Sequence, residues 1–354
     1  MRWMIAPREP RPGDRLFVLA ASALVAALVA GALLALGGAS PLSGLHTLIV
    51  EPLTTGAGLS ETLLLATPIA LCALSVSLAR WLGLWNIGAE GQLLFGAFVA
   101  TGLALYSAGT GGPLSVPLLL GAGALGGALW AAAPILLRER LGVNEILSTL
   151  MLNYVAVAWV ELWVFGPWKG PNNYPYTVDI AAVWQLPTLW RRLHVGFALV
   201  PLIAVLMAWL YRSTLFGYQA RLIGASPEAA RYAGLPVAER QISAFLAAGA
   251  LAGLAGAVQI SGVHHRLEGS VALGYGYTAI LAAFVAGGRP GWAVAISVLL
   301  GALEVGGLGL AVDFPGVSSA LVVVLKGVLF VTLLSGEALT RNRLVRRDPD
   351  GEGA

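Results

Sequence analysis

Apolar runs of about 20 residues recur along this chain, and short polar segments separate them. An α-helix needs about 20 predominantly apolar residues to cross the hydrocarbon core of a bilayer. Most of the runs are close to that length, and we expect each to form one membrane-spanning helix. The pattern therefore predicts an all-α integral membrane protein with about ten transmembrane helices. The runs are 16–36, 60–80, 87–107, 113–137, 145–165, 195–211, 242–262, 271–287, 290–311 and 316–335.

The composition supports a membrane protein and argues against other classes. The chain of 354 residues is 58% hydrophobic and 11% charged, with a mean hydropathy of +0.80. Soluble domains carry about 25% charged residues. The net charge of +3 reflects arginines beside the apolar runs, so we predict no nucleic-acid partner. One cysteine, Cys72, allows no internal disulfide. No HExxH, GxSxG or CxxC motif occurs, and we predict no catalytic residue, metal or cofactor.

Neither lysine of the chain stands in a phosphate-binding loop. Only Lys169 and Lys326 are present, and a glycine follows each of them. The GxxxxGK[ST] loop needs a serine or threonine after its lysine. If ATP drives this protein, another chain hydrolyses it. We therefore predict that this chain is not itself an enzyme, with an intramembrane enzyme as the alternative.

The basic residues gather on one side of the predicted membrane helices. With an internal N-terminus, 16 of the 21 Lys and Arg residues lie in internal segments. Basic residues favour the cytoplasmic side, so both termini are predicted to be cytoplasmic. The predicted parts are a cytoplasmic N-terminus (1–15), a transmembrane domain (16–335) with an external loop (166–194) and a cytoplasmic loop (212–241), and a basic cytoplasmic tail (336–354).

The cytoplasmic loop contains a short helix whose two ends are marked in the sequence. Ser226 is a candidate N-cap, Pro227 suits the first helical position, and Glu228 lies in the first turn near the positive end of the helix dipole. Gly234 ends the helix, and Pro236 prevents its continuation. Two interpretations stay open at this point. Either the segment is a solvated loop, or it is a rigid helix that docks into a groove of a soluble partner. Its small side chains would allow that close contact: Ala229, Ala230 and Ala233.

Polar side chains within the apolar runs are candidates for lining a ligand path. Such groups are costly in a bilayer and usually face a cavity or a partner. Gly88 and Gly91 flank Glu90, which favours a turn or a broken helix at this point. The structural alternative is that Asn153 forms an interhelical hydrogen bond and that Tyr275 and Tyr277 anchor their helix at the membrane interface. The candidate path residues are Asn86, Glu90, Gln92, Asn153, Gln259 and Tyr275.

The remaining patterns predict how the helices pack. Glycines four residues apart, at 123 and 127 and at 249 and 253, allow close helix contact. Glu304 and Lys326 are predicted to neutralise each other between the last two spans. The tryptophans of the external loop suit the headgroup region, and we predict a short interfacial helix over 184–194. Spans 2–5 and 7–10 enter from opposite sides, which suggests an inverted repeat.

Three stretches together resemble the permease subunits of bacterial ABC importers, in the branched-chain amino acid and simple-sugar permease superfamily. The resemblance covers about residues 60–335. Within the superfamily, the chain is most similar to the nucleoside and simple-sugar branch. The stretches are LGLWNIGAEGQLLFGAFVA, GVNEILSTLMLNYVA and GASPEAARYAGLPVAERQISAFLAAGALAGLAGA.

This resemblance implies an inner-membrane subunit of a nucleoside importer that works with other proteins. It implies a cytoplasmic ABC ATPase, a second permease subunit that is identical or homologous, and an external substrate-binding lipoprotein. Simple-sugar or branched-chain amino acid import is the alternative, and a secondary transporter without an ATPase is the alternative from another class. The resemblance further implies an ATPase-coupling helix made of Gly224, Ser226, Pro227, Glu228, Ala229, Ala230, Arg231 and Gly234.

Overall fold

The computed structural model of the chain places a helix in each of the predicted apolar runs. It describes residues 2–7, 13–107, 112–170, 173–272, 274–318 and 320–347. Eight of the described helices are long and apolar enough to cross a membrane, and two shorter apolar helices, Tyr275–Ala286 and Leu321–Gly336, fill the other two runs. The prediction of an all-α, multi-span membrane protein is therefore confirmed. The chain forms two compact units, unit 1 (1–54 and 303–354) and unit 2 (55–302).

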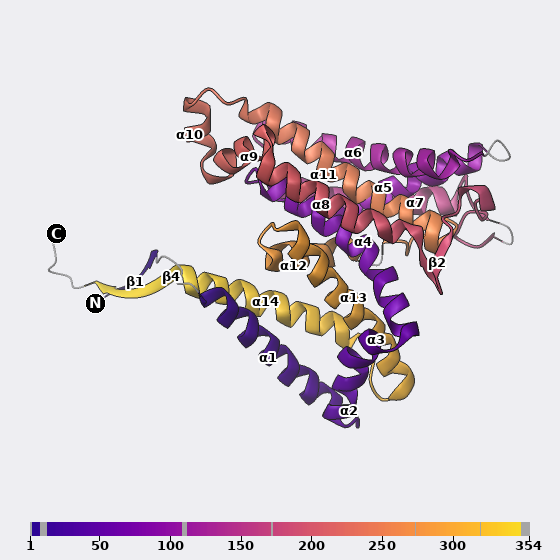
Figure 1. Cartoon of the computed structure of the whole chain (residues 1–354), viewed down its shortest axis with the longest axis horizontal. Coiled ribbons are helices and arrows are strands. Elements are labelled where there is room, and N and C mark those ends of the chain that lie inside the picture. Colours follow the sequence, from indigo (N-terminus) through magenta and orange to yellow (C-terminus); the bar gives the residue numbers. More distant parts are fainter. Residues whose placement is uncertain are drawn as a thin grey trace. The chain divides into compact units, whose positions relative to one another are not determined.

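Unit 2 contains most of the membrane helices (Figure 1). Its helices are α4 (Gly56–Arg80), α5 (Ala89–Tyr106), α6 (Ser115–Leu141), α7 (Glu145–Phe165), α8 (Leu199–Ser213), α9 (Leu215–Ala225), α10 (Pro227–Tyr232), α11 (Val237–Gln259), α12 (Tyr275–Ala286) and the first half of α13 (Pro290–Asp313). Its shorter elements are η3 (Ala182–Trp184), β2 (Thr188–Trp190), β3 (Leu193–His194), η4 (Val195–Ala198) and η5 (Ile260–His264).

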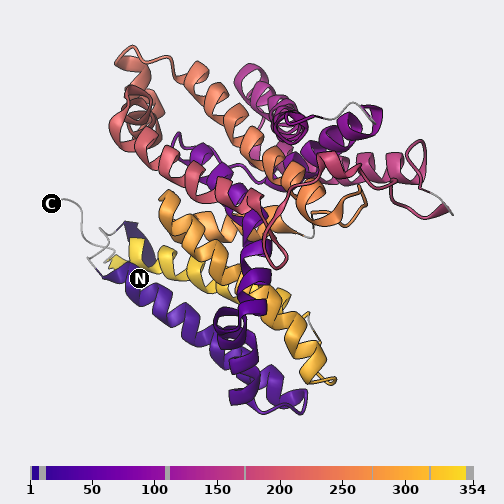
Figure 2. The ribbon, with the colours of Figure 1, turned by 45° about the vertical axis from the view of Figure 1, so that its right-hand side comes forward.

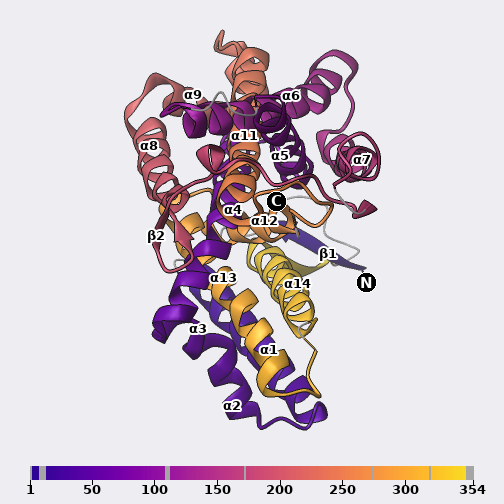
Figure 3. The ribbon, with the colours of Figure 1, turned by 90° about the vertical axis from the view of Figure 1, so that its right-hand side faces the viewer.

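Helix α4 lies at the centre of unit 2, and α11 and α12 pack against it (Figure 3). Nearly every residue of α4 from Leu64 to Ala79 is buried. A helix that is apolar on all sides belongs in the interior of a bundle, and this sequence has that character. Its few hydroxyl groups are partly satisfied within the helix, since the Thr67 hydroxyl donates to the Leu63 carbonyl at 2.8 Å.

Helices α5, α6 and α11 approach so closely that only glycine fits where they cross. A Cβ atom on Gly253 would lie 2.7 Å from the Cα of Gly127, and one on Gly249 would lie 2.6 Å from the Gly127 carbonyl oxygen. Real Cβ atoms essentially never come that close, so a side chain here would force the backbones apart. The predicted role of the two glycine pairs in close packing is confirmed.

We expect Gly253→Leu to destabilise unit 2 strongly. Overpacking a tight core costs about 1–3 kcal/mol and more where a backbone must shift, as it must here. The melting temperature of the purified chain in detergent should fall by several degrees or the folded protein should be lost. Gly121→Leu is the matched control, because a Cβ at Gly121 on α6 meets nothing within 4 Å. Equal melting temperatures for the two variants would contradict this account of the packing.

Unit 1 is built from both ends of the chain. Its elements are β1 (Arg2–Pro7), α1 (Asp14–Leu36), α2 (Pro41–Leu45), η1 (His46–Val50), α3 (Glu51–Thr54), the second half of α13, α14 (Leu321–Arg341) and β4 (Asn342–Arg347). Helix α1 runs beside α14 (Figure 2). Strands β1 and β4 pair antiparallel, with Arg2 opposite Arg347 and Pro7 opposite Asn342.

The terminal strands and the short helices before α4 are features that hydropathy does not predict, because neither is a long apolar run. Helix α14 also extends to Arg341, six residues beyond the predicted end of the transmembrane domain at 335. Residues 1, 8–12 and 348–354 of the two predicted cytoplasmic ends lie outside the described residues. The predicted charge pair within unit 1 is confirmed, since Lys326 Nζ lies 2.5 Å from Glu304 Oε1.

Candidate functional site

The chain is not helical between α4 and α5, although most of this segment is buried. Gly83 turns the chain with a φ of 75°, and an extended stretch leads to Asn86. The Asn86 side chain replaces the missing helical hydrogen bonds. Its Oδ1 accepts from the Gly88 N–H at 3.1 Å and from Gln92 Nε2 at 3.0 Å, and its Nδ2 donates to Gln92 Oε1 at 2.8 Å. The turn predicted near Glu90 is therefore present as the break between α4 and α5, whereas α5 itself is unbroken from Ala89 to Tyr106.

Glu90, in the first turn of α5, holds the start of α12. Its two carboxylate oxygens accept from the backbone N–H groups of Gly274 at 2.8 Å and Gly276 at 2.6 Å. Gly274 is the N-cap residue of α12 and Gly276 lies in its first turn, so the helix cannot satisfy these N–H groups internally. A carboxylate is favoured at this positive end of the helix dipole. Gly274 has a φ of 79°, and α12 begins only after it. Helix α12 is thus 12 residues long, shorter than the predicted run 271–287.

Asn153 connects α7 to the same break. Its Oδ1 accepts from the Gly91 N–H at 2.9 Å, and its Nδ2 donates to the Ile87 carbonyl at 2.9 Å and to the Tyr277 hydroxyl at 3.3 Å. The side chain therefore bonds the backbone on both sides of Glu90. We call the buried group of Asn86, Glu90, Gln92 and Asn153 the polar network.

All six predicted path residues are buried, and four of them form the polar network. Gln259 lies on α11, and its Oε1 has no hydrogen-bond partner among the described residues. Tyr275 is 5% exposed, whereas Tyr277, two residues later, is 41% exposed. The network residues thus have a structural role, because they satisfy backbone groups of the helix break. Their lining of a path stays a prediction.

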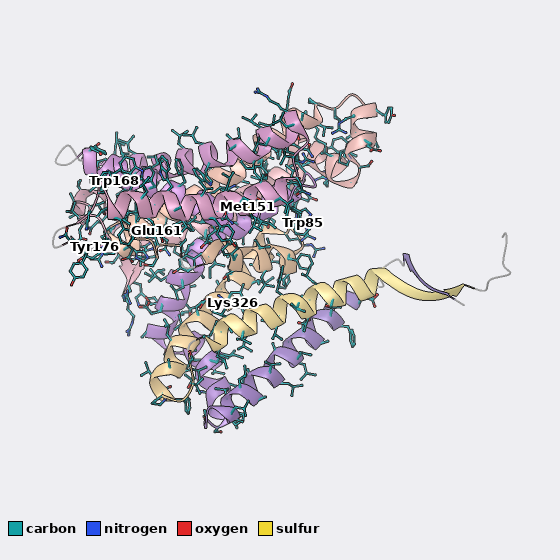
Figure 4. The ribbon with its side chains drawn as sticks, turned by 180° about the vertical axis from the view of Figure 1, so that it is seen from behind. Trp85, Met151, Glu161, Trp168, Tyr176 and Lys326 are labelled. Atoms are coloured by element: carbon teal, nitrogen blue, oxygen red, sulfur yellow. The ribbon has the colours of Figure 1, made fainter. Side chains whose placement is uncertain are left out.

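Exposed aromatic and polar side chains lie beside the network on the outer face of α7 and α12. On α7, Met151, Tyr154 and Glu161 are exposed at spacings of three and seven residues, which place them on one side of the helix. Figure 4 shows Met151 and Glu161 along α7, and Trp85, from the segment between α4 and α5, beyond Met151. Trp85 is fixed by Phe284, at 6.4 Å between ring centroids, and by the Arg80 guanidinium at 5.7 Å. We call Trp85, Met151, Tyr154, Glu161 and Tyr277 the aromatic face.

The predicted path residues include Tyr275 but no residue of the aromatic face. The helical spacing of Met151, Tyr154 and Glu161 was a usable signal, since a charged residue within an apolar run is rarely directed at lipid. Hydropathy alone could not separate this face from the lipid-facing one, because most residues around α7 are apolar.

The predicted capped helix is present as α10, at the end of unit 2 opposite β2 (Figure 1). The Ser226 Oγ accepts from the Ala229 N–H at 3.3 Å, and Pro227 occupies the first turn. Gly234 has a φ of 79°, and the Leu235 N–H donates to the Ala230 carbonyl at 3.0 Å. This pattern is a Schellman motif, which satisfies carbonyls at the end of a helix.

Two details of this region differ from the expectation. A second helix, α9, precedes α10, so the loop is largely helical. Ala230 is only 4% exposed, so it packs against the chain itself and cannot enter a partner's groove. The exposed surface of α10 is instead formed by Glu228, Ala229, Arg231, Tyr232 and Ala233. Tyr232 is 94% exposed. In the sequence, Tyr232 could have been recognised as a candidate contact residue because it is an aromatic residue among small ones.

The helices on both sides of α10 contact the turn that follows α4. A Cβ on Gly224 of α9 would clash with the Trp81 carbonyl oxygen, so only glycine allows this approach. On α11, Gln241 Nε2 donates to the Leu82 carbonyl at 3.1 Å, and its Oε1 accepts from Arg138 at 3.2 Å. Arg138 also pairs with Glu145 at 3.1 Å. The turn that α9 and α11 contact leads directly to Asn86. The helices on both sides of α10 are therefore connected through this turn to the polar network.

At the other end of unit 2, the external-loop prediction is wrong in its detail. Residues 188–194 form the β2–β3 hairpin rather than an interfacial helix, and Arg191 takes a φ of 51° in its turn. Trp184 is buried rather than placed at a surface. His194 is buried as well, and burial, with a smaller effect from neighbouring His265, lowers its pKa to about 4. Its imidazole is therefore neutral at physiological pH.

Comparison with known proteins gives consistent results. A family model described as branched-chain amino acid transport system / permease component matches residues 58–334. The glucose ABC transporter permease protein TsgB13 of Haloferax volcanii is 33% identical over 354 residues, which cover 96% of this chain and 92% of the relative. The guanosine ABC transporter permease protein NupP of Bacillus subtilis is 31% identical over 329 residues, which cover 90% of this chain and 92% of the relative.

A third relative is the nucleoside ABC transporter permease protein NupB of Lactococcus lactis. It is 29% identical over 304 residues, which cover 82% of this chain and 84% of the relative. No solved structure gives a significant match to the chain. The matched range of the family model, residues 58–334, includes the polar network, the aromatic face and α10.

Proposed function

Because the chain belongs to the branched-chain amino acid transport system / permease component family, we propose that it forms the membrane path of an ATP-driven nucleoside importer. The chain is a multi-pass membrane permease subunit. Three relatives carry ABC transporter permease names, which favours an ATP-driven importer over a secondary transporter. ATP hydrolysis is assigned to a partner chain, and this subunit is assigned no catalysis of its own.

Helix α10 is proposed as the docking element for the cytoplasmic ATPase. Its two caps make it a rigid unit, and its exposed side combines small residues with the projecting Tyr232. A movement of α10 would reach α9 and α11, and both contact the turn after α4. The polar network begins at the end of that turn with Asn86. This chain of contacts supports transmission from the ATPase to the membrane helices.

The aromatic face is proposed as the substrate-contacting surface, and it is the observation that carries the proposed path, whereas the choice of a nucleoside follows the names of two relatives. Tyr154, Tyr277 and Trp85 present flat side chains that can stack on a planar base, as aromatic residues do in nucleic-acid recognition. Tyr277 also contacts Asn153 of the polar network, which joins this surface to the helix break. In this proposal, the buried residues of the polar network hold the aromatic face in position and do not contact the substrate themselves. Two relatives named for guanosine or nucleosides support the choice of a nucleoside.

Glucose is the second candidate substrate, because the glucose permease relative is 33% identical over almost the whole chain. Sugars also pack on aromatic side chains, so the aromatic face serves either substrate. The proposed assembly is the same for both. It contains a second permease subunit, two ATPase domains and an external lipid-anchored binding protein, in a bacterial inner membrane with both termini cytoplasmic. The pairing of β1 with β4 supports termini on the same side.

Substrate uptake in the native organism tests the proposal. Deletion of the gene for this chain should abolish uptake of labelled guanosine, and a plasmid copy should restore it. Glucose and leucine uptake should stay unchanged in the same cells. Loss of glucose uptake with intact guanosine uptake would assign the chain to sugar import. Unchanged uptake of all three compounds would reject the proposed substrate classes together.

A further inference from the structure

A cavity of about 1110 Å³ lies at the α9–α10 end of unit 2. It is bounded by the last turns of α8, by α9, by the turn after α4, and by the α12–α13 turn with the start of α13. The aromatic face and α10 contribute no residue to it. The lining residues are Trp81, Ala208, Tyr211, Arg212, Arg221, Gly287, Gly288, Arg289, Pro290, Gly291, Trp292 and Ala295.

The cavity is strongly basic. Arg212, Arg221 and Arg289 come from three different elements, and no acidic residue is among those that line it. All three arginines are exposed. Arg221 is held in position, because its guanidinium donates to the Tyr211 carbonyl and lies 5.2 Å from the centre of the Tyr211 ring. Three positive charges on one cavity wall favour an anionic occupant that accepts several hydrogen bonds.

The start of α13 adds to this positive field. The first turn of α13, Pro290–Trp292, lines the cavity, and the N–H groups of Gly291 and Trp292 have no partner within the helix. A Cβ on Gly291 would meet nothing within 4 Å, so the backbone is open to a ligand there. The N-terminus of a 24-residue helix carries a partial positive charge. The helix and the arginines therefore favour the same sign of charge.

Three aromatic side chains also line the cavity, and hydrogen bonds and ring contacts hold two of them in place. The rings of Trp81 and Tyr211 lie 4.5 Å apart, and Trp81 Nε1 donates to the Gly288 carbonyl at 2.8 Å. Trp292 is 60% exposed at the start of its membrane helix. Exposed tryptophan beside arginine is typical of the level of lipid headgroups. The cavity is thus placed where a membrane helix leaves the hydrocarbon.

We propose that this cavity binds the phosphate headgroup of an anionic phospholipid. The arginines and the α13 N-terminus contact the phosphate, and Trp292 packs against the glycerol region. The inference rests on the proposed function for the cytoplasmic placement of this end of unit 2, and it is independent of the transported substrate. Anionic lipids are concentrated in the cytoplasmic leaflet, and this is the end of unit 2 that we propose to be cytoplasmic. Basic pockets between membrane helices on that side are suited to such headgroups.

The apolar surface that continues from the cavity favours a lipid over a free anion. Ala208 and Ala295 line the cavity from within the membrane helices α8 and α13. Next to them on the same helices, Val205, Trp209 and Leu299 are exposed apolar residues. Acyl chains attached to a phosphate in the cavity can lie along this surface. A soluble phosphate gains nothing from it.

Native mass spectrometry of the full chain in detergent tests the proposal with cardiolipin, phosphatidylglycerol and phosphatidylcholine as probes. The wild type should retain the two anionic lipids and not phosphatidylcholine. Arg212→Gln with Arg289→Gln should weaken anionic lipid binding about thirtyfold, since each basic residue near an anionic headgroup contributes about a factor of five. Lysine at both positions should keep most of the binding, because it keeps both charges.

Arg140→Gln is the matched control, because Arg140 is an exposed arginine at the same end of unit 2 and outside the cavity. It should bind lipid like the wild type. Gel filtration establishes that each variant is folded. The proposal is overturned if the double glutamine variant keeps wild-type affinity, or if phosphatidylcholine binds equally well. Displacement of bound lipid by inorganic phosphate at the same concentration would overturn it in favour of a free anion.

Discussion

An Ala229→Trp substitution on α10 is expected to lower substrate uptake about a hundredfold while the chain still inserts into the membrane. Ala229 is exposed on the surface that we propose to dock against the ATPase. A tryptophan there prevents close seating, and the loss of a central docking contact costs about 2–4 kcal/mol. Each 1.4 kcal/mol is tenfold in affinity. Labelled-substrate uptake and co-purification of the ATPase measure the effect.

The exposed fraction of each alanine decides which substitution can test docking. Ala230→Trp is a poor probe, because Ala230 is packed inside and its substitution would disrupt the chain's own fold. Ala238→Trp is the matched control, since Ala238 is exposed in the first turn of α11, outside α10. It should leave uptake and ATPase association near wild type. Wild-type ATPase association in Ala229→Trp would show that α10 does not dock the ATPase.

Glu90→Ala is expected to destabilise unit 2 severely and to abolish transport. The substitution removes the acceptor of the Gly274 and Gly276 N–H groups in a buried position. An unsatisfied buried N–H costs about 1–3 kcal/mol, so two cost about 2–6 kcal/mol. A loss of this size is a large part of the stability of a folded protein. The melting temperature in detergent and the yield of folded chain report it.

Two further variants separate this effect from a general loss of negative charge. Glu90→Gln keeps one acceptor oxygen and should give an intermediate melting temperature. Glu239→Ala removes an exposed carboxylate from the first turn of α11 and should change the melting temperature little. If Glu90→Ala melts like Glu239→Ala, the hydrogen bonds to α12 do not stabilise the fold. Uptake lost at a normal melting temperature would instead place Glu90 directly in the path.

The sequence by itself determined the helices, the helix break and the ends of α10. Long apolar runs form helices in a bilayer because each backbone group must be satisfied within its own segment. The caps of α10 follow from Ser226, Pro227 and Gly234, which act on residues within one turn. The glycines around Glu90 marked the break for the same reason. These features depend on near neighbours in the chain, so they can be predicted from the order of residues.

Only the tertiary structure decided which side of each helix is covered. The residues around most spans are almost uniformly apolar, so periodicity does not distinguish lipid from protein contact. Tyr275 is buried and Tyr277 is exposed, although the two are only two residues apart, on either side of Gly276. The partners of Glu90 lie more than 180 residues away in sequence. Contacts over such distances depend on how whole helices pack, which no local pattern specifies.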